Sequence, residues 1–154
     1  MSDVQVKAEQ LEVLKVLYPW YKEEVFRRRE QMMRLTAFAS AFLVLLLITM
    51  VAVPARPRPD FTTALFAVTG VALFSATFVY LVLQQRSRHR MAKQALIEIE
   101  RTLGLYEEGF YLEGKALYPE EWQTAWTTDR SVIVYITVLT TLTVLVIAAV
   151  LLRP

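Results

Sequence analysis

The chain has 154 residues, of which 55% are hydrophobic, and its net charge is +2 at neutral pH. The length suits a single domain, but the apolar fraction is too high for an ordinary water-soluble fold. Because the sequence holds no cysteine, disulfides, thiolate catalysis and cysteine metal sites are excluded.

The N-terminal segment, residues 1–34, predicts a cytoplasmic amphipathic helix. Apolar residues recur at helical spacing from Val4 to Tyr18, and charged residues take the opposite face. Proline has no backbone N–H to donate and disfavours helical geometry at the residue before it. We therefore expect the helix to break or kink at Pro19 and a second helix to begin near Trp20.

Three later runs contain no charged residue and are long enough to cross a membrane. They hold 19, 23 and 22 residues and cover 35–53, 61–83 and 131–152. A helix needs about 20 apolar residues to span the hydrocarbon core of a bilayer. In water, three such runs would leave almost nothing in so short a chain to cover them. The sequence therefore predicts an all-α integral membrane protein with three transmembrane helices, the last one in the C-terminal segment 131–154.

The first two spans are expected to form a transmembrane hairpin over residues 35–83. The link between them, residues 54–60, contains three prolines, which hold the backbone extended. Asp60, at the end of this link, is a suitable N-cap for the second span.

The sequence of residues 84–130 predicts a cytoplasmic helix, then a loop, then a short helical segment that contains tryptophan and precedes the last span, here called the elbow. The helical spacing of apolar residues continues beyond the second run, so this helix should extend to Gly104, a residue type that favours helix ends. A tight turn is expected at Glu113-Gly114. The elbow should begin at Pro119, because proline and the two glutamates after it suit the first turn of a helix.

The same three residue types precede the first and the last span. Leu17-Tyr18-Pro19 and Leu117-Tyr118-Pro119 are each followed closely by aromatic residues. Indole and phenol rings favour the headgroup level of a bilayer. We therefore predict membrane-interface positions for Trp20, Tyr21, Trp122 and Trp126. Packing of these aromatics against the other cytoplasmic helices is the alternative, and the two interpretations are compatible.

Basic residues are distributed unequally around the first two spans. Nine lie within 22–34 and 86–93, against two, Arg56 and Arg58, in the link. Short loops rich in Lys and Arg stay in the cytoplasm, so we expect the N-terminus inside and the C-terminus outside, in the inner membrane of a prokaryote. Anionic lipids of the bilayer are the expected contact of Arg27, Arg28, Arg29, Arg34, Arg86, Arg88 and Arg90.

The sequence offers no constellation typical of an enzyme, a pump or a transporter. Every Asp, Glu, Lys and Arg lies outside the three runs, whereas coupled transport needs an ionisable group at membrane depth. The single histidine, His89, lies between Arg88 and Arg90, and the acidic residues within 107–121 fit no calcium loop. We therefore expect no enzymatic activity, no cofactor and no metal site. No nucleic-acid partner is expected either, because anionic lipid explains the basic residues beside the spans better.

Small and hydroxyl-bearing residues form faces on all three spans. Small residues let helices approach closely, and threonine hydroxyls bond across helices or back to their own backbone. Packing of the three helices is the favoured interpretation, and lining of a small aqueous pore in an oligomer is the alternative. The helix-packing residues predicted in this way are Ala37, Ala41, Thr69, Ala72, Ala76, Thr137 and Thr141.

These observations lead to two hypotheses of function. The first is a non-enzymatic accessory, scaffold or assembly subunit of a larger membrane complex, with other membrane subunits or further copies of itself as partners. The second is a homo-oligomeric membrane-perturbing effector or pore controlled through its cytoplasmic helices. In architecture alone, residues 1–105 resemble the two-span SLATT-type effector domains of bacterial defence systems, in which a transmembrane hairpin lies between amphipathic helices. The chain departs from that architecture by its third span and shares no motif with it.

Overall fold

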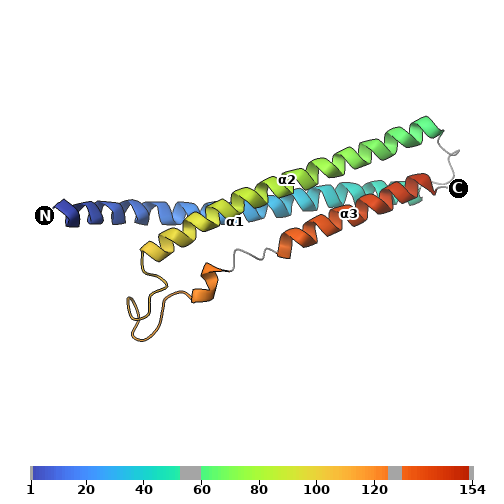
Figure 1. Ribbon diagram of the computed structural model, residues 1–154. Coiled ribbons are helices and arrows are strands. Elements are labelled where there is room, and N and C mark those ends of the chain that lie inside the picture. Colours follow the sequence, from blue (N-terminus) through green and yellow to red (C-terminus); the bar gives the residue numbers. More distant parts are fainter. Residues whose placement is uncertain (1, 53–59, 125–129, 153–154) are drawn as a thin grey trace. The chain divides into compact units, whose positions relative to one another are not determined.

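The computed structural model describes residues 2–52, 60–124 and 130–152, with side chains from residue 10 onward. In chain order these ranges form α1 (Ser2–Ala52), α2 (Phe61–Thr102), the 3₁₀-helix η1 (Glu120–Gln123) and α3 (Arg130–Leu151) (Figure 1). Within them the one β contact is an isolated bridge between Leu112 and Lys115. The all-helical class predicted from the sequence is confirmed for these ranges. Three helices, α1, α2 and α3, are each long and apolar enough to cross a membrane.

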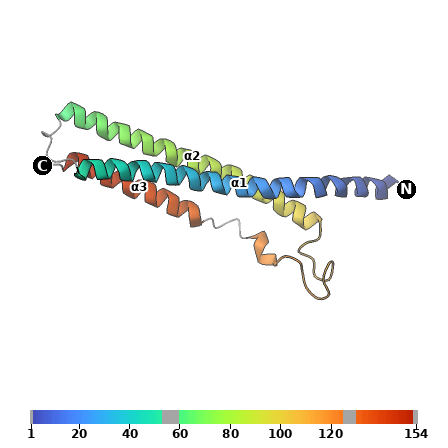
Figure 2. The same cartoon turned by 180° about the vertical axis from the view of Figure 1, so that it is seen from behind.

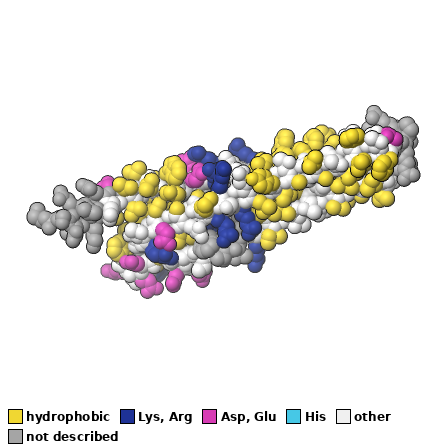
Figure 3. All heavy atoms as spheres, turned by 45° about the horizontal axis from the view of Figure 1, so that its top comes forward, with side chains coloured by type: hydrophobic (Ala, Val, Ile, Leu, Met, Phe, Trp, Pro, Cys, Tyr) yellow, Lys and Arg dark blue, Asp and Glu magenta, His cyan; other side chains and the backbone are white. Residues whose placement is uncertain are grey.

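The chain divides into two compact units. Unit 1 consists of Met1–Arg29 and Arg86–Asp129, and unit 2 consists of Glu30–Gln85 and Arg130–Pro154. α1 and α2 each supply one part to unit 1 and the other part to unit 2. The boundaries lie within a few residues of the ends of the charge-free runs. On the face shown in Figure 3, hydrophobic side chains accordingly cover the part of unit 2 that these runs form.

The break predicted at Pro19 does not occur, because α1 continues through this residue as one helix of 51 residues. Proline inside a helix removes one hydrogen bond and costs about 3 kcal/mol relative to alanine. The neighbouring Tyr18 is held in unit 1 by a side-chain contact with Tyr118. Tertiary contacts of this kind can outweigh a local propensity. The second helix expected near Trp20 is therefore the continuation of α1.

Unit 2 is built from α3 and the apolar parts of α1 and α2, which lie side by side (Figures 1 and 2). Within this unit α2 runs antiparallel to α1, and α3 runs parallel to α1. Two clusters of buried hydrophobic residues join the helices. The first holds Met32, Val82 and Val132, and the second holds Ala39, Leu43, Leu139 and Val146. Both clusters contain residues of α1 and α3, so α3 packs directly on the hairpin.

A contact between hydroxyl groups links α2 to α3 inside unit 2. Thr143 Oγ1 lies 2.6 Å from the Ser75 hydroxyl oxygen and 2.7 Å from the Leu139 carbonyl oxygen. A threonine hydroxyl carries one hydrogen, so both contacts are satisfied when Thr143 donates to Leu139 and accepts from Ser75. Thr143 therefore bonds both to its own helix backbone and across to a neighbouring helix.

The predicted ends of α2 are confirmed. Asp60 caps the N-terminus, because its carboxylate accepts a hydrogen bond from the Thr63 backbone N–H at 3.3 Å and another from the Thr63 hydroxyl. Gly104 follows the C-terminus with a φ of +71°, the left-handed conformation that ends many helices. The tight turn predicted at Glu113-Gly114 is also present, with a φ of +65° at Gly114.

Candidate functional site

The two Leu-Tyr-Pro sequences meet in unit 1 through their tyrosines. The hydroxyl oxygens of Tyr18 and Tyr118 lie 2.8 Å apart, a hydrogen-bond distance between residues 100 positions apart in the chain. The backbone N–H of Tyr118 also donates to the Leu105 carbonyl oxygen at 2.9 Å. The segment that leads to η1 is therefore attached to both α1 and the end of α2.

A buried carboxylate joins these tyrosines to form a cluster of Tyr18, Glu100, Tyr106 and Tyr118, here called the tyrosine cluster. Glu100 is 8% exposed and accepts a hydrogen bond from the Tyr106 hydroxyl, and the Tyr18 hydroxyl also faces it. Burial raises the pKa of Tyr18 well above its ordinary value, and the hydrogen bond with Tyr118 and the charge of Glu100 act in the same direction. Burial and the hydrogen bond to Glu100 likewise raise the pKa of Tyr106. These two phenols therefore stay protonated at neutral pH.

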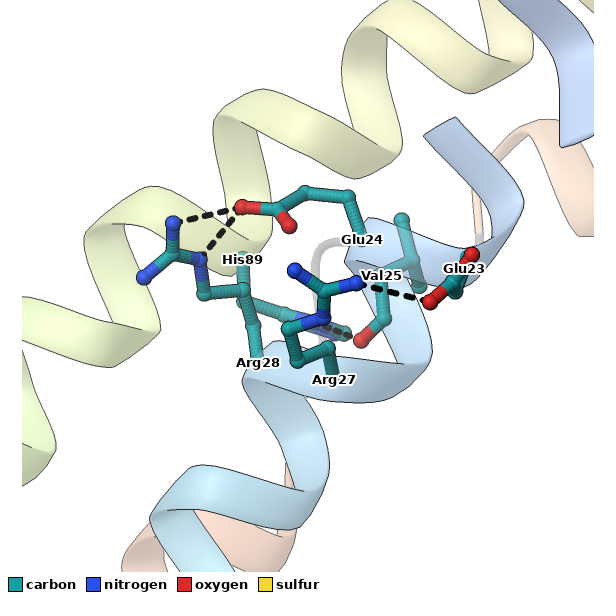
Figure 4. Close-up of polar contacts among 6 residues, drawn as sticks. All are labelled: Glu23, Glu24, Val25, Arg27, Arg28 and His89. Atoms are coloured by element: carbon teal, nitrogen blue, oxygen red, sulfur yellow. Dashed lines mark hydrogen bonds and ion pairs between the residues drawn. The ribbon is translucent and has the colours of Figure 1, made fainter. Parts of the chain in front are cut away.

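A second contact joins α2 to α1 within unit 1 (Figure 4). His89 Nδ1 lies 3.1 Å from the Val25 carbonyl oxygen, which can only accept, so Nδ1 carries the hydrogen. Two neighbours on α1, Arg27 and Arg28, instead bind glutamates one turn earlier on the same helix. The single histidine thus has a structural contact that links two helices.

The tyrosine cluster forms one end of a pocket of about 350 Å³ in unit 1. Its walls come from one face of α1, one face of α2 and the segment that follows α2. On both helices the lining residues follow a helical pattern of i, then i+3 or i+4, then i+7 or i+8, which brings them to one side. This volume lies within the range typical of small-molecule sites, about 300–1,000 Å³. The lining residues are Tyr18, Lys22, Val25, Phe26, Lys93, Leu96, Ile97, Glu100, Tyr106, Tyr118 and Trp122.

Two lysines give this pocket positive charge, and one of them lies near a ring of the tyrosine cluster. Lys93 precedes Glu100 by two helical turns on the same face of α2, about 10 Å along the axis. Lys22 Nζ lies 5.8 Å from the centre of the Tyr18 ring, within cation–π range. Among the described residues, neither Lys22 nor Lys93 forms an ion pair. The pocket is therefore lined by two cations and one carboxylate, that of Glu100 in the tyrosine cluster.

Sequence reasoning missed most of this pocket. The repeated Leu-Tyr-Pro sequences drew attention to Tyr18 and Tyr118. The amino-acid sequence of a single chain, however, contains no signal that residues so far apart are in contact. Lys93 and Glu100 could have been grouped by their spacing of seven, which places them on one helical face. Nothing in the sequence shows which element covers that face.

The side chains that line this pocket are basic, acidic, phenolic or apolar. Its lining contains no serine, cysteine or histidine, and its one carboxylate is engaged by phenol groups. In the described ranges no group of three or more His, Cys, Asp or Glu side chains is placed to hold a metal ion.

The predicted interface aromatics are partly engaged by other rings. Trp20 is exposed and meets Tyr21 edge-on, with ring centres 4.9 Å apart. Trp122, of η1, lines the pocket and lies 5.2 Å from the Tyr118 ring. Trp126 lies outside the described residues. Membrane contact of these aromatics stays a prediction, while Trp122 clearly has a protein environment on one side.

Three of the seven arginines predicted to contact anionic lipid are paired with glutamates of their own helix. The N–O distances are 2.7 Å in Arg27–Glu23, 2.5 Å in Arg28–Glu24 and 2.6 Å in Arg34–Glu30. Arg29, Arg88 and Arg90 are exposed, and Arg86 is half-buried. Lipid contact stays a prediction for all seven, and three glutamates reduce the net charge available for it.

All seven predicted helix-packing residues are exposed: Ala37, Ala41, Thr69, Ala72, Ala76, Thr137 and Thr141. None of them belongs to the two buried clusters that join the three helices. Larger side chains such as Leu43 and Leu139 fill the inside of unit 2 instead, because they make more contacts in the space between helices. Contacts of the small residues with other chains stay a prediction.

Comparison of the chain with protein-family models, with curated proteins and with solved structures finds no match in any of the three. A functional inference for this chain therefore depends on its residues and their geometry.

Proposed function

We propose that the chain is a non-enzymatic multi-pass membrane subunit that assembles with other membrane proteins, as an accessory or scaffold component of a larger complex. One observation carries the proposal: the small-residue faces of all three candidate spans point outward, away from the chain's own core. The charge-free runs also hold no Asp, Glu, Lys, Arg or His, whereas pumps and coupled transporters need such groups at membrane depth.

The outward faces have the features of helix contacts in a bilayer. Ala37 and Ala41 lie one turn apart on α1, Ala72 and Ala76 lie one turn apart on α2, and α3 carries two threonines at the same spacing. Lipid tails are as apolar as leucine, so helices in a bilayer associate through close packing and hydrogen bonds rather than through the hydrophobic effect. Small side chains permit that approach. A face that only met lipid would gain nothing from them.

The proposed orientation places the N-terminus and residues 84–130 in the cytoplasm and the C-terminus outside, in the inner membrane of a prokaryote. Nine basic residues flank the hairpin on the proposed inner side, against two in the link. In unit 2 the C-terminal end of α3 lies at the same end as the C-terminal end of α1 and the N-terminal end of α2, as alternating spans require (Figure 1). A reporter of cytoplasmic location should be active when fused after Gln85 and inactive after Pro154. Cytoplasmic activity of the second fusion would contradict this orientation.

The assembly proposal is tested by purification in mild detergent, with quantitative mass spectrometry of the proteins that accompany the chain. We expect a fixed set of foreign membrane proteins with the native chain. Ala72→Leu should reduce their yield at least several-fold, because a leucine would hold the partner helix away from α2. The thermal stability of the chain itself should stay unchanged, since Ala72 is exposed. Thr77→Leu is the matched control, because Thr77 is exposed on the same helix but lies about 100–140° around it from Ala76 and Ala72.

Three outcomes separate the hypotheses. Loss of foreign partners with Ala72→Leu but not with Thr77→Leu supports an accessory subunit. A ring of identical chains without foreign proteins would favour the homo-oligomeric effector or pore instead. An isolated chain with neither kind of partner would refute both.

A further inference from the structure

Lys22 and Lys93 lie at the same level on opposite walls of the pocket in unit 1. The contact between His89 of α2 and Val25 of α1 gives a common reference point for positions along the two helices, which run in opposite directions there. Lys22 precedes Val25 by three residues and Lys93 follows His89 by four, so each lies about 5–6 Å further along its helix from that contact. Both lysines thus line the same pocket, and neither has an ion-pair partner among the described residues.

The walls around these lysines are apolar and incompletely covered. Phe26 is 62% exposed and Trp122 is 53% exposed, although both line the pocket. Leu96 and Ile97 form the floor on α2. Apolar walls with a few convergent polar groups are the usual composition of small-molecule sites.

We propose that this pocket binds a small amphipathic anion. Its acidic group, a carboxylate, phosphate or sulfonate, lies between Lys22 and Lys93, and its apolar part lies against Phe26, Leu96 and Trp122. The carboxylate of Glu100 repels the acidic group from the tyrosine cluster, so the ligand has one orientation. Pairing with the acidic group would also supply the ion-pair partner that neither lysine finds among the described residues.

The test uses the full chain in nanodiscs of zwitterionic phosphatidylcholine and two probes with the same aromatic skeleton. Anilinonaphthalene sulfonate carries the negative charge, and N-phenylnaphthylamine lacks it. Binding is measured by energy transfer from tryptophan, which selects probe bound close to the protein over probe dissolved in lipid. We expect saturable binding of the sulfonate.

Charge variants decide the orientation and the role of each lysine. Lys22→Gln and Lys93→Gln should each weaken the sulfonate about tenfold, as expected for loss of one charge-assisted hydrogen bond, with little effect on the uncharged probe. Lys115→Gln is the matched control, because Lys115 is an exposed lysine of unit 1 that does not line the pocket. Leu96→Trp, which fills the pocket, should weaken both probes. Equal affinities in all three lysine variants, or no saturable binding to the native chain, would overturn the proposal.

The natural anion has two possible sources, a membrane lipid or a soluble molecule. Phosphatidylglycerol added to the nanodiscs distinguishes them. Competition with the sulfonate would identify a lipid headgroup and its adjoining chain as the ligand. An unchanged affinity would leave a soluble amphipathic anion as the ligand of the same site.

Discussion

Replacing Tyr118 with phenylalanine removes the hydroxyl group that contacts Tyr18 and leaves the ring in place. The two oxygens are 2.8 Å apart in a half-buried setting, where a hydrogen bond contributes about 1 kcal/mol net. Tyr18 keeps a second partner, because its hydroxyl also faces Glu100. The penalty for an unpaired buried hydroxyl is thereby avoided, and the expected cost stays at about 1 kcal/mol rather than the upper value of about 3 kcal/mol.

Hydrogen–deuterium exchange of the segment between α2 and η1 measures this cost. The backbone N–H of Tyr118 donates to Leu105, so it exchanges only when the segment opens. A loss of about 1 kcal/mol should speed its exchange about fivefold. The double variant Tyr18→Phe/Tyr118→Phe should exchange about as fast as Tyr18→Phe alone, because the shared hydrogen bond is lost only once.

Tyr111→Phe is the matched control. The Tyr111 hydroxyl donates to the Leu103 carbonyl oxygen at 2.8 Å, but Tyr111 is exposed and its carbonyl partner can bind water. Exchange at Tyr118 should therefore change less than twofold in this variant, as is usual for surface substitutions worth under about 0.5 kcal/mol. If Tyr118→Phe and Tyr111→Phe had the same effect, the contact between the two Leu-Tyr-Pro sequences would not hold the segment in place.

Three further perturbations test the fold. The pKa values of Tyr18 and Tyr106 are raised in the folded chain, so their contribution to stability is complete below the ordinary tyrosine value of about 10 and is lost as the pH rises above it. The melting temperature in detergent should therefore fall in that range, and less so when both residues are phenylalanine. Leu139→Ala should lower the stability of unit 2 in detergent by about 2 kcal/mol, because Leu139 is fully buried, whereas Val144→Ala, at a position 59% exposed, should have little effect on the melting temperature. Asp60→Ala should cost about 1 kcal/mol through loss of the N-cap and speed exchange in the first turn of α2, whereas Asp60→Asn, which retains a capping oxygen, should not.

The elements that the sequence predicted correctly depend on local physical chemistry. Charge-free runs of the required length predict candidate spans because length and composition alone set that requirement. Asp60 and Gly104 mark the ends of α2 because an N-cap needs a side-chain oxygen and a helix end favours a left-handed residue. Pro19 shows the limit of such reasoning. Its local cost is real, but contacts of the adjoining turn with a distant segment decide whether the helix continues.

The candidate site was largely beyond prediction because it is made of contacts distant in the chain. Tyr18 and Tyr118 repeat one short sequence, yet their shared feature is a mutual hydrogen bond, which a repeat alone does not imply. The small-residue face through Ala72 and Ala76 is a second case in which the sequence does not determine the contact. Helical spacing establishes that these residues share a face, but the choice between inside and outside depends on which neighbouring face fills space better. In unit 2 mainly leucine, valine and phenylalanine fill the inside and leave Ala72 and Ala76 outward. A small-residue face in a membrane helix therefore predicts a close contact without naming its partner, and the outward position of Ala72 and Ala76 is the reason why we propose another molecule as that partner.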